Sequence, residues 1–151
     1  MKAFRIRKNA ETFLLEIMSL DDNEKGKLWE KLEAKPDYAE EFSEAVFYLM
    51  ESSIRPVKLL IAANLIKALS VDKVTLDQHQ DLMYLLEEAS MYELKELKKF
   101  NDELAAGKER GDMDGPMAPM GAFFTRGARG QMSEIGKLMY QHGMQEVKFD
   151  I

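Results

Sequence analysis

The 151-residue sequence contains no cysteine, so it can form no disulfide bond, carry no catalytic thiolate and bind no metal or iron–sulfur cluster through cysteine sulfur. Histidine is nearly as rare, because His79 and His142 are the only two in the chain. Neither has a second histidine three or four residues away, the spacing by which metal-binding helices place two ligands on one face. We therefore expect ordinary surface or boundary histidines, no metal site and no cofactor.

Motifs of the common enzyme classes are also missing from the sequence. There is no glycine-rich phosphate-binding loop and no Gly-X-Ser-X-Gly nucleophile elbow. Two acidic pairs, Glu40–Glu41 and Glu87–Glu88, could serve acid–base catalysis only if they met in a cleft. Because adjacent residues on a helix point in different directions, a solvated helix face is the better interpretation of each pair. The sequence thus predicts a protein that is not an enzyme.

Long hydrophobic segments and strongly basic regions are absent too. The longest apolar stretch, residues 57–69, is too short to cross a bilayer and contains polar side chains. The basic N-terminal residues are not followed by an apolar segment of the signal-peptide type, and we expect a cytoplasmic protein without a membrane span. The formal net charge is −6, and residues 71–110 carry 6 basic and 10 acidic side chains. Nucleic-acid-binding proteins usually present a basic face, so this balance argues against one.

What the sequence does have is helical periodicity along its first two thirds. Apolar side chains recur every three or four residues in six segments, and each segment begins with a residue that suits a helix start. These starts are Asn9, Asp21 or Asp22, Pro36, Pro56, Thr75, and the capping-box pair of Ser90 and Glu93. The side chains expected to point inward are Ala10, Phe13, Leu14, Ile17, Met18, Leu28, Trp29, Leu32, Tyr38, Phe42, Ala45, Val46, Leu49, Leu76, Leu82, Met83, Leu86, Ala89, Leu94, Leu97, Phe100 and Leu104.

One of these segments, residues 56–70, is apolar on nearly all sides. A helix of this kind in a water-soluble protein is usually the central and most buried one, and the other segments supply enough apolar faces to surround it. The alternative is a helix that lies on a membrane surface or binds a partner. We expect the buried position.

A change of composition near residue 108 divides the chain. Residues 1–107 form the expected helical domain, and Gly107 is a suitable stop for its last helix. Residues 108–120 are rich in methionine, proline and glycine and lack apolar periodicity, which is typical of a linker. Residues 121–151 are expected to form a β-hairpin and a short helix packed on the same domain. The predicted fold is mainly α, a bundle of six to seven helices with a small C-terminal β-hairpin element.

The expected hairpin consists of residues 121–125 and 131–132, joined by a glycine-containing turn at residues 126–130. The other features expected near it are a helix capped by Ser133 and ended by Gly143, with Ile135, Leu138 and Met139 inward, and an extended piece at residues 147–151 that could add a third strand.

Three methionines, Met113, Met117 and Met120, cluster in the expected linker. Thioether sulfurs can bind Cu(I), but the sequence offers no other soft ligand to complete such a site. An adaptable apolar surface is therefore the preferred interpretation of this cluster.

The candidate interaction site lies within residues 121–144 and has Phe123, Phe124, Arg126 and Arg129 as its key side chains. Adjacent residues on a strand point to opposite faces, so only one of the two phenylalanines can enter a one-sided core. The other phenylalanine and the arginines are of the types that anchor protein interfaces, which favours docking of a partner protein or of a second copy. The alternative is that both phenylalanines pack under the linker and the element only caps the helices.

Three segments of the sequence carry a resemblance to known proteins. They are the run from "NAETFLLEIMSL" to "AANLIKAL", then "QDLMYLLEEAS" and "SEIGKLMY". In these segments the chain resembles a loosely related set of bacterial all-helical proteins that end in a winged-helix-like hairpin and a short helix. The resemblance implies a helical core with a wing-like end and carries over no catalytic residue. The long linker at residues 108–120 departs from that pattern.

The expected function is a non-catalytic bacterial or phage regulatory module that binds another protein or itself. The first alternative is a winged-helix-like regulator, in which Arg126 and Arg129 at the hairpin tip would enter the minor groove of DNA. The second is an acidic inhibitor that mimics nucleic acid, which the negative charge of residues 71–110 favours.

Overall fold

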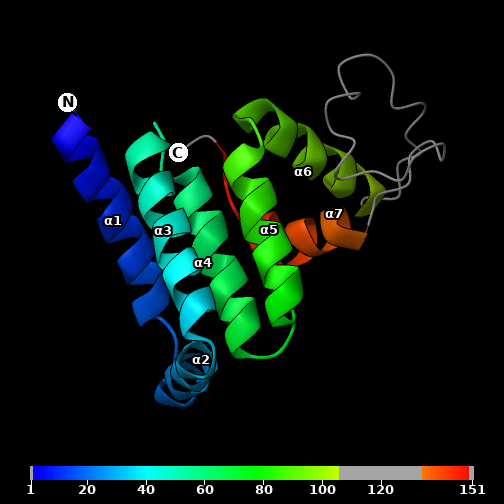
Figure 1. Ribbon diagram of the computed structural model, residues 1–151. Coiled ribbons are helices and arrows are strands. Elements are labelled where there is room, and N and C mark those ends of the chain that lie inside the picture. The colour runs from blue at the N-terminus through cyan, green and yellow to red at the C-terminus, as the bar shows by residue number, and fades with distance from the viewer. Residues whose placement is uncertain (1, 106–133, 150–151) are drawn as a thin grey trace.

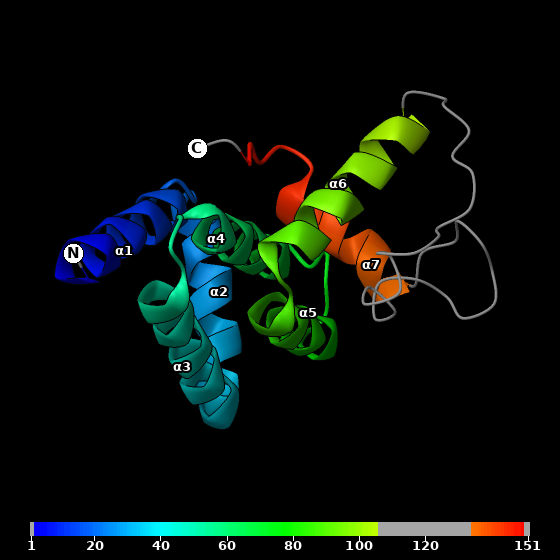
Figure 2. The same cartoon turned by 90° about the horizontal axis from the view of Figure 1, so that it is seen from above.

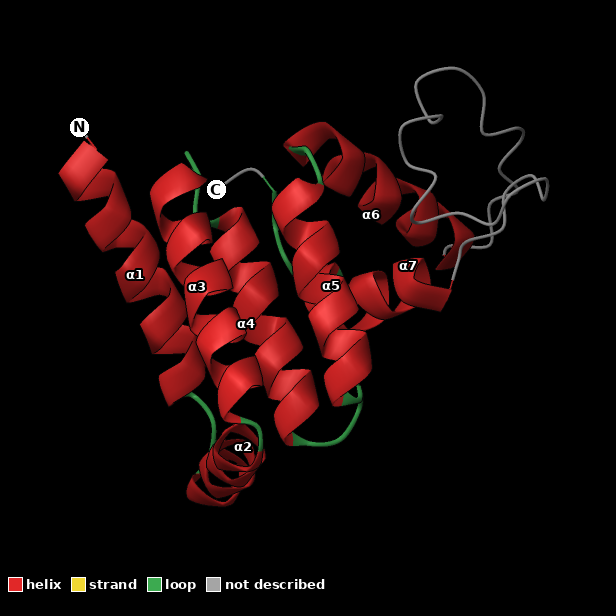
Figure 3. Ribbon diagram, in the orientation of Figure 1, coloured by secondary structure: helices red, strands yellow, loops and turns green. Residues whose placement is uncertain are grey.

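The structure is a computed structural model that describes residues 2–105 and 134–149. Its elements are α1 (Lys2–Met18), α2 (Asp22–Ala34), α3 (Pro36–Ser52), α4 (Val57–Ser70), α5 (Leu76–Glu88), α6 (Met91–Ala105), α7 (Glu134–Leu138) and a π-helix, η2 (Met139–Met144). The described part of the chain contains helices and loops and no strand (Figure 3). The mainly α prediction is therefore confirmed, whereas the expected linker and hairpin, residues 108–132, lie outside the described residues, as do Gly107 and Ser133.

Local signals in the sequence determine where most of the helices begin. In front of α2, the Asp21 carboxylate accepts a hydrogen bond from the backbone N–H of Glu24 at 2.7 Å, and the Glu24 carboxylate accepts one from the N–H of Asp21. Reciprocal capping boxes of the same kind precede α5 and α6, formed by Thr75 with Gln78 and by Ser90 with Glu93. Each box pairs backbone N–H groups that the first turn of a helix leaves free. Pro36 is the first residue of α3, as predicted, and Pro56 directly precedes α4.

The core is built around α4, which lies behind α3 in Figure 1 and between α1 and α5 when the molecule is seen from above (Figure 2). Helices α1, α2, α3, α5 and η2 all pack against it. Its fully buried side chains include Leu59, Ile61, Leu65 and Leu69. The prediction that this helix is the central one is confirmed. None of the described helices is long and apolar enough to cross a membrane.

The first helix begins at Lys2 and not after Asn9 as predicted, because the apolar stripe that faces the core continues through Ile6. Asn9 is consequently not a helix cap. It is buried within α1, where its side-chain amide donates hydrogen bonds to the backbone carbonyls of Met50 at 3.1 Å and Ser53 at 2.9 Å. These carbonyls lie at the end of α3. Because they accept its hydrogen bonds, the polar Asn9 side chain can be buried in the core.

Three side chains that were expected to point inward are exposed: Leu14, Met18 and Trp29. Helix α1 packs on the core with a narrow face that centres on Phe13, and Leu14 and Met18 lie outside it. Helix α2 is peripheral and buries Leu28, whereas the next residue, Trp29, is rotated about 100° around the helix.

The last described helix differs from the prediction as well. Gly143 does not end it but lies buried inside the π-helix. A Cβ atom on Gly143 would come within 3.0 Å of the Ile61 side chain and 3.2 Å of Leu65, both on α4. The carbonyl of Gly143 accepts a hydrogen bond from the Asn64 side chain at 2.9 Å. Residues 147–149 form no strand, and Val147 packs against the core.

Candidate functional site

The side chains predicted to form the interaction site, Phe123, Phe124, Arg126 and Arg129, lie outside the described residues, and so does the methionine cluster. They remain predictions. Among the described residues, no group of three or more histidine and acidic side chains is arranged to hold a metal ion. The candidate site that the structure does describe is a groove on the face of the molecule formed by α3 and α5.

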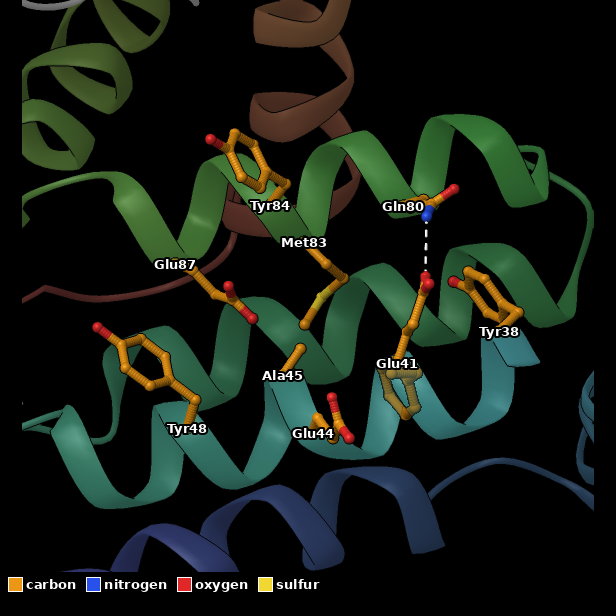
Figure 4. A pocket seen from close by; sticks show the side chains of 10 residues that line it. Tyr38, Glu41, Glu44, Ala45, Tyr48, Gln80, Met83, Tyr84 and Glu87 are labelled. Atoms are coloured by element: carbon orange, nitrogen blue, oxygen red, sulfur yellow. Dashed lines mark hydrogen bonds between the residues drawn. The ribbon is translucent and has the colours of Figure 1, made fainter. Parts of the chain in front are cut away.

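This α3–α5 groove has a volume of about 410 Å³ (Figure 4). It is lined by Tyr38, Glu41, Phe42, Glu44, Ala45 and Tyr48 of α3 and by Gln80, Met83, Tyr84 and Glu87 of α5. On both helices the lining residues recur every three or four positions, which places them on one face of each helix. The groove therefore results from two helical faces that are far apart in the sequence and lie side by side in the fold.

The floor of the groove is apolar. Met83 and Ala45 point toward each other across it (Figure 4), and Met83 is buried. Phe42 anchors the floor to the core, because its ring lies 6.4 Å from the ring of Phe13 and 5.6 Å from that of His79, measured between centroids. A flexible methionine beside an aromatic ring can adapt to differently shaped apolar side chains.

The rim carries negative charge from Glu41, Glu44 and Glu87, and none of the described residues that line the groove is basic. The side-chain amide of Gln80 donates a hydrogen bond to the Glu41 carboxylate at 2.9 Å, which links the two walls. Burial, followed by the neighbouring charge of Glu88, raises the pKa of the Glu87 carboxyl, and Lys58 opposes this rise. A cation in the groove would therefore favour the ionised form of Glu87.

Tyrosine rings stand at both ends of the groove. Tyr38 is half-buried, whereas Tyr48 and Tyr84 are largely exposed. Figure 4 shows Glu87 directed toward the α3 wall near Tyr48, with Tyr84 on the same end of α5. Each ring offers a flat apolar surface with a negative face and a polar hydroxyl tip.

A second hollow of about 590 Å³ continues the groove at the N-terminal ends of α3 and α5. It shares Tyr38, Glu41 and Gln80 with the first and adds two acidic residues and one basic residue, namely Asp37, Asp77 and Lys35. The surface between the two helices is thus acidic along much of its length.

His79 lies directly behind this surface and is fully buried, so its interpretation as a surface or boundary histidine was wrong. Its ring nitrogen Nδ1 shares a hydrogen bond with the Tyr38 hydroxyl, and no described residue pairs with its other nitrogen, Nε2. Burial lowers the pKa of His79 to about 4, which keeps the ring neutral at pH 7. Burial also raises the pKa of the Tyr38 phenol, with a smaller contribution from Glu41.

One of these features, the burial of His79, could have been found in the sequence. His79 precedes Leu82, Met83 and Leu86 by three, four and seven residues, which extends the buried stripe of α5 by one turn. The acidic pairs offered no such signal: one member of each, Glu41 and Glu87, lines the groove, and Glu41 is nevertheless solvent-exposed, as the solvated-face interpretation predicts. The other members, Glu40 and Glu88, are solvent-exposed as expected.

A further hollow of about 490 Å³ lies between α4 and η2. Its lining mixes charges of both signs: Glu24, Lys67, Lys73, His142 and Glu146. Lys67 already forms an ion pair with Glu16 at 2.7 Å, and burial together with the charge of Lys73 lowers the pKa of His142. No single ligand charge is favoured here.

The α3–α5 groove, in contrast, favours one ligand chemistry. Carboxylates and tyrosine faces both attract a cation, and the apolar floor can receive an aliphatic or aromatic side chain. Comparison of the chain with protein-family models, with curated proteins and with solved structures finds no match.

Proposed function

We propose that the protein is a non-catalytic interaction module that holds a basic, partly apolar segment of another protein in the α3–α5 groove. The observation that carries the proposal is the composition of the groove, with an apolar floor at Met83, tyrosine ends and the carboxylates of Glu41, Glu44 and Glu87. A regulatory role in a bacterium or phage is part of the proposal, and the resemblance noted in the sequence supports only the bacterial origin.

Binding explains this composition better than catalysis does. The carboxylates are on the rim, and the groove lining includes no histidine, lysine or serine that would complete a nucleophile–base pair among the described residues. A shallow groove between two packed helices instead suits a third helix or an extended segment, which is a common mode of peptide recognition.

The charges and the apolar floor have different roles in this proposal. Exposed ion pairs contribute about 0–1 kcal/mol each and are screened by salt, so the carboxylates mainly select basic partners and accelerate their association. Most of the affinity comes from apolar side chains buried against Met83 and the tyrosine rings, at about 25 cal/mol per Å². We therefore expect binding that weakens with salt but persists.

Selection of short random peptides on the purified protein tests the proposal. The expected winners combine arginine or lysine with a neighbouring apolar residue. When these peptides bind, the chemical-shift changes of the protein's backbone amides should map to α3 and α5. Tyr84→Ala should weaken their binding at least tenfold, and Tyr92→Ala should not, because both tyrosines are exposed but only Tyr84 lines the groove, whereas Tyr92 lies on α6 outside it. Peptides without basic residues, or shifts that map elsewhere, would refute the proposal.

The nucleic-acid alternative makes the opposite demand on the partner. Phosphates would be repelled by the groove, and DNA binding would rest on Arg126 and Arg129, which the structure does not describe. Titration with DNA at physiological salt distinguishes the two. We expect no binding, and a salt-sensitive complex that Arg126→Ala/Arg129→Ala abolishes would favour the winged-helix alternative.

A further inference from the structure

Helix α1 carries a second apolar face that the fold leaves uncovered. Phe4, Leu15 and Met18 are 71%, 68% and 68% exposed. With Lys8 and Glu11 they recur at intervals of three and four residues, which places them on one stripe along the outside of the helix. Figures 1 and 2 show α1 at one edge of the bundle, so this outer stripe faces away from the other helices.

The N-terminal half of α1 is also basic. Lys2, Arg5, Arg7 and Lys8 all precede Glu11, the first acidic residue of the chain. No acidic residue occupies the first turn of the helix, where the helix dipole favours acids and disfavours cations. Arg7 pairs with Glu11 at 3.1 Å, and both side chains are largely exposed. This placement of charge is unfavourable for α1 itself, and it becomes favourable when an acidic surface lies against the helix.

The outer stripe of α1 fits the α3–α5 groove in length and in chemistry. Phe4 and Leu15 are eleven residues apart, about 16 Å along the helix, and Tyr38 and Tyr48 at the two ends of the groove are ten residues apart, about 15 Å. The N-terminal half of the stripe offers Phe4 beside the cation of Lys8, and the C-terminal half offers Leu15 and Met18. The one acid between them, Glu11, is paired with Arg7. The groove offers an apolar floor flanked by carboxylates.

We infer that the groove binds α1 of a second copy of this chain, with the outer stripe seated between α3 and α5. The inference rests on the proposed function, because it treats the groove as a site for basic, partly apolar segments, and it identifies one such segment. Figure 2 shows α1 at one edge of the bundle, away from α5, so the outer stripe of α1 and the α3–α5 groove are different surfaces of one molecule. Two copies that each seat the α1 stripe in the other's groove form a closed dimer with two-fold symmetry, whereas a one-sided contact forms a ring or extends from copy to copy.

Sedimentation velocity of the full chain over a range of concentrations tests the inference with a charge-swap design. The wild type should associate as its concentration rises, and less so at high salt. An Arg7→Glu/Lys8→Glu variant and a Glu44→Lys/Glu87→Lys variant should each associate at least tenfold more weakly. Mixed together, they should form a complex, because the reversed α1 of one now complements the reversed groove of the other.

A second pair of variants tests whether association depends on the stripe itself or on any exposed apolar side chain. Leu15→Ser should weaken association at least tenfold, whereas Trp29→Ser should leave it unchanged, since Trp29 is equally exposed but lies on α2. All four residues of the charge-swap variants are solvent-accessible to some degree, and thermal melting followed by circular dichroism verifies that every variant is folded.

Four outcomes are distinguishable. The inference is supported if each charge-reversed variant alone loses self-association and a mixture of the two variants regains it. A wild type that stays monomeric but binds selected basic peptides in the groove overturns the inference and leaves the proposed function intact. A wild type that binds neither its own copy nor basic peptides overturns both, and association that survives the charge reversals overturns the inference.

Discussion

Acidification should destabilise this protein through one buried side chain, His79. Burial lowers its pKa in the folded state from 6.5 to about 4. The unfolded chain therefore takes up the proton first as the pH falls. The stability that depends on neutral His79 is fully present above pH 6.5 and is lost between pH 6.5 and about 4. A difference of about 2.5 pKa units corresponds to roughly 3 kcal/mol, most of which is lost by about pH 4.5. Against a typical total stability of about 5–15 kcal/mol, that loss is large.

Urea unfolding followed by circular dichroism, at pH 7 and at about pH 4.5, measures this effect, with His79→Phe as the matched variant. Phenylalanine keeps a ring against Phe42 and Tyr38 but cannot be protonated, so it should lose about 2–3 kcal/mol less on acidification than the wild type. Acidic residues and His142, whose pKa is also lowered by burial and Lys73, titrate in both proteins and cancel in the comparison. Equal losses in the two proteins would show that His79 is not the buried neutral group described here.

Three further predictions concern stability at neutral pH, each measured by denaturant unfolding. Gly143→Ala should destabilise the protein by about 1–3 kcal/mol, because the added methyl would meet α4 within 3.0 Å. The control, Gly26→Ala, has no atom within 4 Å of the new methyl and should stabilise the protein by up to about 1 kcal/mol. Equal effects of the two substitutions would contradict the packing of η2. Asn9→Leu should cost about 2–4 kcal/mol, since it leaves two carbonyls at the end of α3 buried without their donor, and a neutral result would place Asn9 outside the core. Tyr140→Phe should cost about 0.5–1.5 kcal/mol by removing the hydroxyl that donates to Asp102 at 2.7 Å, and a stabilised variant would refute that hydrogen bond.

The sequence was sufficient for the helices whose starts depend on local chemistry. Asp21, Pro36, Thr75 and Ser90 each act within three residues of themselves, through capping bonds or a fixed backbone angle, so their effects can be predicted without knowing the fold. The central position of α4 was also predictable, because a helix that is apolar on nearly all sides must be surrounded.

The groove could not be predicted in the same way, because it depends on which helices lie side by side. Glu41 and Glu87 are 46 positions apart in the chain, and nothing near either residue indicates that α3 and α5 are neighbours. Asn9 shows a related difficulty: the same residue type suits a helix cap and a buried hydrogen-bond donor, and only the position of the end of α3 decides between them.

Helix α3 forms one wall of the groove, and one buried polar residue links it to each of two of its neighbours, α1 and α5. On one side, Asn9 of α1 holds the backbone at the C-terminal end of α3. On the other, His79 of α5 holds Tyr38 near its N-terminal end. Apolar contacts alone tolerate small rotations of one helix against another, whereas a buried hydrogen bond is lost when its partners move apart. The two residues thus set the position of the α1 stripe and of the acidic groove relative to a common helix. His79→Phe keeps the ring packing but removes the hydrogen bond to Tyr38. We therefore expect it to increase the mobility of the groove walls while changing the free energy of unfolding at neutral pH only slightly.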